Sequence, residues 1–426
     1  MKIRLRHWAK LTDAEIALEG ITVLAGSNGV GKSSVCRALM TLATLIRRVG
    51  ERIVDEREHS LHEQFAKWVG ELLPGKILPL AGYTADRVET RKIPYDTPET
   101  LFDAFIHPIA DSKDEQKLCR RIFLNAYPQW QTIAEGIRRR PDADYVRLIV
   151  RKAFLKAFDG QIAPLRNGHW TPSVEISDGD VRTAVTFDGN TPSEIVPPTL
   201  SAARLACGTF YLEPSHVLDR CVVDSPTADD RYGEGCNTWK NLLYTNSNVR
   251  VQDLSLEATE RLDRIREILC DITKTIHGHL EIADRTLVFS ESEANQPIQL
   301  SNIASGVKSA AVIIRALELG AIQPGDILII DEPESNLHPE WQLVFARFLT
   351  ELQSRLGIRL LLSTHSPYFL MAIQTYAGDL NLNDRCRFYQ FVPSEEANGL
   401  FETKDVTSAP DKIFETMYRP FESLGF

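Results

Sequence analysis

The sequence predicts an α/β fold in which a mixed sheet with flanking helices carries a mostly helical insertion. Three observations support this prediction. A short β-type run at residues 21–25 leads into a glycine-rich loop and then a helix. Two continuous apolar runs, at residues 327–330 and 360–362, have the composition of strands buried on both faces of a parallel sheet. Between residues 51 and 158, apolar residues recur instead at helical spacing.

The glycine-rich loop has the spacing G-x-x-x-x-G-K-S of a phosphate-binding loop. Its glycines let the backbone fold tightly, so that consecutive N–H groups point at a phosphate chain, and the following helix adds the partial positive charge of its N-terminus. In this pattern Lys32 reaches the β- and γ-phosphates and Ser33 ligates Mg²⁺. The flanking strand and helix favour this interpretation over a chance glycine loop. The predicted nucleotide-binding residues are Gly26, Ser27, Asn28, Gly29, Val30, Gly31, Lys32, Ser33 and Ser34.

Composition narrows the class of protein. The chain has 426 residues, of which 43% are apolar and 25% charged, as in a soluble globular protein of two domains or lobes. Its net charge of −10 excludes a molecule that is basic overall, although a local basic face stays open. Seven cysteines without a C-x-x-C pair predict neither a disulfide framework nor a zinc site. No apolar run is long enough for a membrane helix and the N-terminus lacks a signal-peptide core, so we expect a cytoplasmic protein.

The remaining elements can be placed in chain order. Residues 3–8 and 14–19 alternate as two strands, and the helix after the phosphate loop is expected to run to about Arg48. Residues 172–187 read as a hairpin that turns at Asp178 and Gly179. A strand is expected at 208–212, a loop at 224–248, a helix at 254–277 and strand-like alternation at 280–298. The helix end at His277 and His279 favours a cap over a metal site, and a solvated surface is favoured over a nucleic-acid contact for Arg138, Arg139 and Arg140.

A second anion-binding surface is predicted where Ser305 and Gly306 open a helix, with Lys308 in its first turn. Taken alone, this pattern is more typical of a simple helix N-cap at Ser305 than of an anion-binding site. The anion-binding interpretation becomes the favoured one because the pattern lies upstream of an apolar strand that ends in two carboxylates. At this strand end Asp331 can help hold Mg²⁺, and Glu332 can orient or deprotonate the attacking water. The next buried strand ends at His365, which could contact the γ-phosphate or that water.

These segments resemble the ABC-type ATPase heads of the branch that contains SMC, RecF and OLD-family proteins and the ATPases of bacterial defence systems. The resemblance rests on the Walker A loop at 26–34, the signature at 304–308, Walker B at 327–332 and the histidine switch at 363–366. The run at 331–339 is similar to the OLD and RecF form. The signature reads A-S-G-V-K where transporters have L-S-G-G-Q, so Ser305 and Gly306 carry over most firmly. The Q-loop glutamine is not assigned; Gln64 lies in the helical insertion.

The resemblance implies a P-loop NTPase that binds ATP and Mg²⁺. In this family two heads pair head-to-tail, so each ATP lies between one Walker A loop and the partner's signature. The lobes are then 1–50 with 160–215, and 286–426, separated by the helical insertion at 51–159 and a loop and helical segment at 216–285. The chain has no long heptad arm and no nuclease module after His365, and in this plan it is similar to the stand-alone ATPases PtuA of Septu and AriA of PARIS systems.

Three functions follow from the resemblance. The leading one is an ATP-dependent switch, as a homodimer or higher oligomer, that holds or licenses a separate effector, a nuclease, in antiviral defence. The second is a RecF- or SMC-like repair ATPase that binds DNA directly, against which the acidic balance argues mildly. The third, a transporter ATPase with a membrane partner, is the least favoured. The helical insertion is the candidate docking site for the effector.

Overall fold

The computed structural model describes residues 1–73, 98–103, 112–164, 170–200, 203–212, 278–283, 286–291, 296–299, 302–303 and 305–422. The predicted loop at 224–248, the helix at 254–277 and Ala304 of the signature lie outside these residues. The chain divides into two compact units, one formed by Met1–Arg47 with Val150–Phe426 and the other by Arg48–Ile149.

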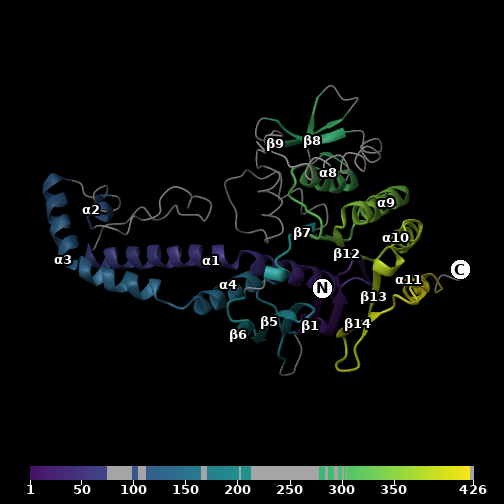
Figure 1. Cartoon of the computed structure of the whole chain (residues 1–426), viewed down its shortest axis with the longest axis horizontal. Coiled ribbons are helices and arrows are strands. Elements are labelled where there is room, and N and C mark those ends of the chain that lie inside the picture. The colour runs from purple at the N-terminus through teal and green to yellow at the C-terminus, as the bar shows by residue number, and fades with distance from the viewer. Residues whose placement is uncertain are drawn as a thin grey trace. The chain divides into compact units, whose positions relative to one another are not determined.

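A large mixed sheet organises the first unit (Figure 1), which confirms the predicted fold class. Its order is β6-β5-β4-β1-β2-β14-β13-β3-β12-β11-β7. In chain order the strands are β1 (Lys2–Trp8), β2 (Leu11–Ala17), β3 (Ile21–Ala25), β4 (Ser173–Asp178), β5 (Val181–Asp188), β6 (Thr191–Val196), β7 (Thr209–Leu212), β11 (Ile327–Asp331), β12 (Arg359–Thr364), β13 (Cys386–Pro393) and β14 (Phe401–Asp405).

The parallel part of the sheet carries the nucleotide motifs. Strands β13, β3, β12, β11 and β7 run parallel, with Ala25 opposite Thr364 and Asp331 opposite Ser363. Because the carboxyl ends of parallel strands meet at one edge, the segments after β3, β11 and β12 emerge side by side. The core here combines these strands with apolar residues of α8 (Ser305–Glu318), α9 (Pro339–Leu356) and α10 (Pro367–Asp379), and α11 (Asp411–Glu422) adds Ile413. The described 3₁₀ helices are Ala203–Leu205 and Asn383–Arg385.

The other half of the sheet is antiparallel except where β14 pairs with β2, which runs parallel. Strands β4 and β5 form the predicted hairpin, with Asp178 opposite Val181 and Gly179 at a φ of +58°. Strand β2 begins at Leu11, three residues earlier than expected, and β6 was not predicted. Trp8, at the end of β1, packs in an aromatic cluster. Its ring contacts three phenylalanine rings edge-on, those of Phe154, Phe158 and Phe187. A separate antiparallel sheet consists of β8 (Gly278–Ala283), β9 (Thr286–Glu291) and β10 (Ile298–Gln299), where alternation was expected.

The second unit is helical in its described residues. The helix after the phosphate loop, α1 (Lys32–Leu72), does not end near Arg48 as predicted but continues for 41 residues. No proline interrupts it, and its one early helix breaker, Gly50, is tolerated because nothing lies within 4 Å of its missing side chain. The unit also contains α2 (Pro98–Leu101), α3 (Lys113–Arg138) and the start of α4 (Asp142–Ala157). Its core is aromatic: the ring of Trp68 contacts those of Phe65, Phe123 and Trp130, and Phe65 also contacts Trp130.

Candidate functional site

The phosphate loop lies between β3 and α1, as the sequence predicts. Gly29 and Gly31 have φ angles of +77° and +112°, a region that disfavours residues with a side chain. A Cβ on Gly31 would also lie 2.8 Å from a Leu11 methyl carbon, so the start of β2 packs directly on the loop. Ser27, Asn28 and Gly29 are exposed at the tip, while Gly26 and Val30 are buried. Both glycine conformation and packing therefore fix the loop in a tight turn.

Lys32 opens α1 and is buried. Its Nζ donates to the carbonyl oxygens of Gly26 (2.8 Å) and Ser27 (2.9 Å). Burial lowers the pKa of Lys32, and the carboxylates of Asp331, Glu332 and Glu334 partly offset this shift. The two carbonyl oxygens hold the ammonium group of Lys32 inside the loop. Ser33 and Ser34 follow in the first helical turn, both half-buried.

Asp331 is the last residue of β11 and is buried at 4% exposure. The strands on either side hold its carboxylate in place. Oδ2 accepts from the hydroxyl of Tyr211 on β7 (3.1 Å), and Oδ1 accepts from the hydroxyl of Ser363 on β12. Two donors stabilise the ionised carboxylate and fix its direction. Sequence reasoning missed Tyr211, because only the order of the strands in the sheet brings β7 next to β11.

Glu332 follows Asp331 in an unusual backbone conformation. Its φ is +51°, which is uncommon for a residue with a side chain and costs free energy unless the surroundings impose it. The surroundings do so here, because its N–H donates to the carbonyl of Ser363 (2.9 Å) and its Oε2 accepts from the hydroxyl of Ser335 (3.1 Å). The turn directs the carboxylate toward His365, whose Nδ1 lies 3.8 Å from Oε1.

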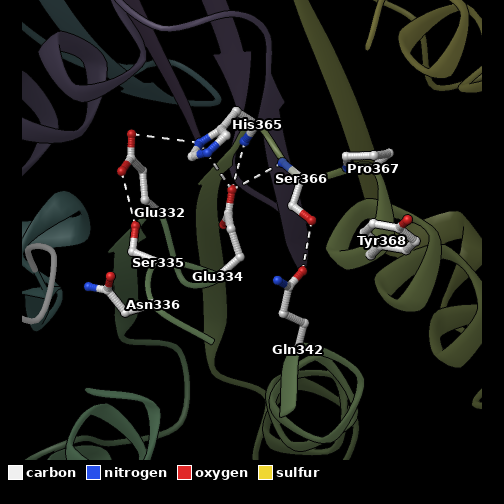
Figure 2. Close-up of a pocket in the computed structure, with 9 residues that line it drawn as sticks. All are labelled: Glu332, Glu334, Ser335, Asn336, Gln342, His365, Ser366, Pro367 and Tyr368. Atoms are coloured by element: carbon white, nitrogen blue, oxygen red, sulfur yellow. Dashed lines mark hydrogen bonds and ion pairs between the residues drawn. The ribbon is translucent and has the colours of Figure 1, made fainter. Parts of the chain in front are cut away.

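His365 follows β12 and is half-exposed. It lines a cavity of about 480 Å³ at the carboxyl edge of the sheet (Figure 2). Figure 2 also shows Glu334 beneath the imidazole, with its Oε1 at 3.3 Å from Nδ1. Glu334 lies in the run 331–339, which is similar to the OLD and RecF form, but the sequence alone predicts no role for its carboxylate. The cavity is lined by Glu332, Glu334, Ser335, Asn336, Gln342, His365, Ser366, Pro367 and Tyr368.

The predicted signature opens α8. Ser305 and Gly306 form the first turn of α8, as expected, and Lys308 is buried at 3% exposure. The structure thus brings Lys32, Asp331, Glu332 and His365 to one edge of the sheet.

The described oxygens suit a hard divalent cation together with a nucleotide. Within the described residues, no three His, Cys, Asp or Glu side chains form a self-sufficient metal site. If Ser33 and the buried carboxylate of Asp331 held a cation, they would supply oxygen ligands alone, which is the donor set that Mg²⁺ accepts when phosphates and water complete its shell. In the described part of the chain no helix is both long and apolar enough to cross a membrane.

One family model matches part of the chain. Residues 219–372 match the family described as "AAA domain, putative AbiEii toxin, Type IV TA system". This match is less than half of the chain; it includes Ser305, Asp331 and His365 but not the phosphate loop. No curated protein matches the sequence.

Among solved structures, three SMC heads are similar at low identity. The first is an SMC head bound to the C-winged helix domain of ScpA, with 10% identity, a TM-score of 0.43 and coverage of 96% of this chain and 98% of that chain. The second is the SMC head domain from Thermotoga maritima, with 12% identity, a TM-score of 0.35 and coverage of 95% of this chain and 98% of that chain. The third is a Pyrococcus furiosus SMC head with an extended coiled coil bound to the C-terminal domain of ScpA, with 10% identity, a TM-score of 0.39 and coverage of 97% of this chain and 98% of that chain. The family match, together with the phosphate loop, supports an ATPase.

Proposed function

We propose that this chain binds and hydrolyses ATP as an ABC-type ATPase of the SMC, RecF and OLD branch. The observation that carries the proposal is the common edge of β3, β11 and β12, from which Lys32, Asp331, Glu332 and His365 all emerge. A phosphate-binding loop beside two carboxylates and a histidine is the set of groups that phosphoryl transfer to water requires.

Each group has a distinct task in this proposal. The loop N–H groups and Lys32 bind the phosphates, and Ser33 with Asp331 would hold Mg²⁺, which supplies neutralising charge for the phosphate oxygens. Glu332 orients the attacking water and accepts its proton as the bond to the γ-phosphorus forms and the bond to the β-phosphate oxygen breaks. His365, within reach of Glu332, contacts the γ-phosphate or the same water.

Two substitutions test the ATPase. Lys32→Ala should abolish nucleotide binding, because it removes the buried cation of the loop. Glu332→Gln should keep ATP bound but lower kcat by about 100-fold or more, since it removes the proton acceptor. Calorimetric ATP binding and phosphate release measure the two effects. Lys404→Ala, at an exposed lysine on β14, is the control for the first. Unchanged turnover in Glu332→Gln would remove Glu332 from the mechanism.

We infer further that ATP switches the surface offered to a separate effector, a nuclease, in antiviral defence. The description of the matched family as part of a toxin–antitoxin system supports this role, as does the resemblance to stand-alone defence ATPases. The test is to express the chain with its native neighbouring genes and to identify what co-purifies with and without ATP and Mg²⁺. A nucleotide-dependent complex with a nuclease supports the switch, and a bare dimer that binds DNA replaces it with the repair function.

One observation favours that second function, direct DNA binding. Beyond Asp144, helix α4 has four exposed cationic side chains and no acidic ones, namely Arg147, Arg151, Lys152 and Lys156. Arg147 and Arg151 are one helical turn apart and share a face. If this face binds a phosphate backbone, DNA affinity should fall steeply with salt and the Arg147→Glu/Arg151→Glu variant should lose it. DNA binding that ignores both changes would exclude α4 as the contact.

A further inference from the structure

We propose that Glu334 is a positioning residue that fixes His365 at the edge of the site. The proposal rests on the ATPase function above and adds to it a residue for which the sequence predicted no role. Glu334 lies in the turn after β11, three residues beyond Asp331, whereas His365 follows β12. One side chain therefore joins the ends of two neighbouring strands (Figure 2).

Three donors from the turn after β12 converge on a single oxygen of Glu334. Oε1 accepts from the hydroxyl of Thr364 (2.7 Å) and from the backbone N–H groups of His365 (2.8 Å) and Ser366 (3.1 Å). Backbone N–H groups at a turn have no regular partner within it, so this carboxylate takes the place that a neighbouring strand would otherwise fill. The backbone on both sides of the histidine Cα is thereby held against the turn after Asp331.

The imidazole itself also faces this carboxylate. Nδ1 of His365 lies 3.3 Å from Oε1 of Glu334, nearer than the 3.8 Å that separates it from Glu332. Glu334 is buried at 5% exposure, and its other oxygen, Oε2, has no hydrogen-bond partner among the described atoms. This approach places Nδ1 on the side of the ring that faces Glu334, so the carboxylate contacts the imidazole as well as the backbone on both sides of it. With Nδ1 next to the carboxylates, Nε2 is the ring nitrogen left for phosphate or water.

A second set of hydrogen bonds, which does not involve Glu334, holds the end of this turn at Ser366. Ser366 caps α10 by accepting from the N–H of Phe369 (3.2 Å), and its hydroxyl donates to Oε1 of Gln342 on α9 (2.7 Å). The start of α10 thus stays anchored without Glu334. Removal of Glu334 should therefore loosen His365 and its backbone while the two helices remain packed.

The kinetic test is a double-mutant cycle between Glu334 and His365. Glu334→Ala should lower kcat by about 10- to 100-fold, as misplacement of a reacting group does, with KM for ATP within about twofold. Glu334→Gln should recover part of the loss, because its amide oxygen can still accept from the three donors. In a His365→Ala background, Glu334→Ala should cost nothing further. Equal losses in both backgrounds would show that Glu334 acts through general stability and would overturn the proposal.

A matched control and an activity-independent readout complete the test. Glu351 is a buried glutamate of α9 that pairs with Arg347 and Arg355, and Glu351→Ala should leave kcat unchanged. In NMR spectra of histidine-labelled protein, the His365 ring signal, assigned by its loss in His365→Ala, should move in Glu334→Ala and not in Glu351→Ala. An unmoved signal overturns the positioning role even if the wild-type protein proves to have no ATPase activity, and the latter result would by itself overturn only the proposed function.

Discussion

The carboxylate of Asp331 shows how single residues of neighbouring strands prepare the site. Tyr211→Phe removes the hydroxyl that donates to Oδ2 and keeps the ring that fills the space. Because a cation ligand that loses an orienting partner typically costs 10- to 100-fold in metal affinity, we expect the Mg²⁺ concentration for half-maximal ATPase to rise about tenfold. The measurement is a Mg²⁺ titration of turnover. Tyr389→Phe is the control, since the Tyr389 hydroxyl accepts from the N–H of Ala17 away from the site; an equal rise there would contradict the assignment.

The buried thiol of Cys386 predicts how the stability of the protein changes with pH. Burial raises the pKa of this thiol from 9.0 to about 11. Below pH 9 the thiol is protonated in both the folded and unfolded states, so it adds no pH dependence. Between pH 9 and 11 the unfolded chain loses this proton first, and the free energy of unfolding falls as pH rises. Thermal melts at pH 8 to 11 should show a smaller decrease in Tm for Cys386→Val than for wild type. A decrease of the same size would show that other groups dominate, such as Cys36, whose pKa burial raises in the same direction.

Two glycines, one in the phosphate loop and one in α1, should respond in opposite ways to substitution by alanine. Gly31, in the phosphate loop, combines a φ of +112° with a Cβ position 2.8 Å from Leu11, whereas Gly50 lies in the open middle of α1. Gly31→Ala should destabilise the protein by about 2 kcal/mol or more and weaken ATP binding. Gly50→Ala should stabilise it by about 0.5–1 kcal/mol. Chemical denaturation with calorimetric ATP titration measures both. If Gly31→Ala were neutral, the loop would not need the conformation described above.

The elements differ in how far sequence could predict them. Strands β11 and β12 were predicted because continuous apolar runs end in polar residues, and β3 because a short β-type run precedes the glycine-rich loop; these are local signals. The predicted end of α1 near Arg48 was wrong, because the open surroundings of Gly50 let the helix continue and no local signal in the sequence reveals them. The partners of Asp331 and His365 could not be predicted, since Tyr211 and Glu334 come close only through the strand order β12-β11-β7. Residues in a sequence motif can therefore be predicted from the sequence, whereas contacts between side chains of different strands can be known only once the order of the strands is known.

At the scale of the whole molecule, the proposed function requires two chains. In the proposed head-to-tail dimer, the signature turn at Ser305, which opens α8, would complete the nucleotide site of the partner chain. Such a dimer is a closed two-fold arrangement with two composite sites. In that proposed dimer, ATP would favour the paired state only by its greater affinity for it, and hydrolysis would remove that preference. A single chain should therefore bind ATP but hydrolyse it poorly.

Complementation between two inactive variants tests this arrangement. Lys32→Ala lacks a working phosphate loop but keeps its signature, and Ser305→Arg keeps the loop but introduces bulk and charge at the signature turn. Each variant alone should be inactive. An equal mixture should recover about a quarter of the wild-type rate, because half of the dimers are mixed and each mixed dimer has one intact composite site. Phosphate release measures recovery, and a mixture of Lys32→Ala with Lys32→Ala/Ser305→Arg, which contains no intact loop, is the inactive control. Full activity of Ser305→Arg alone would mean that each chain hydrolyses ATP without its partner's signature, and the head-to-tail dimer would then be wrong.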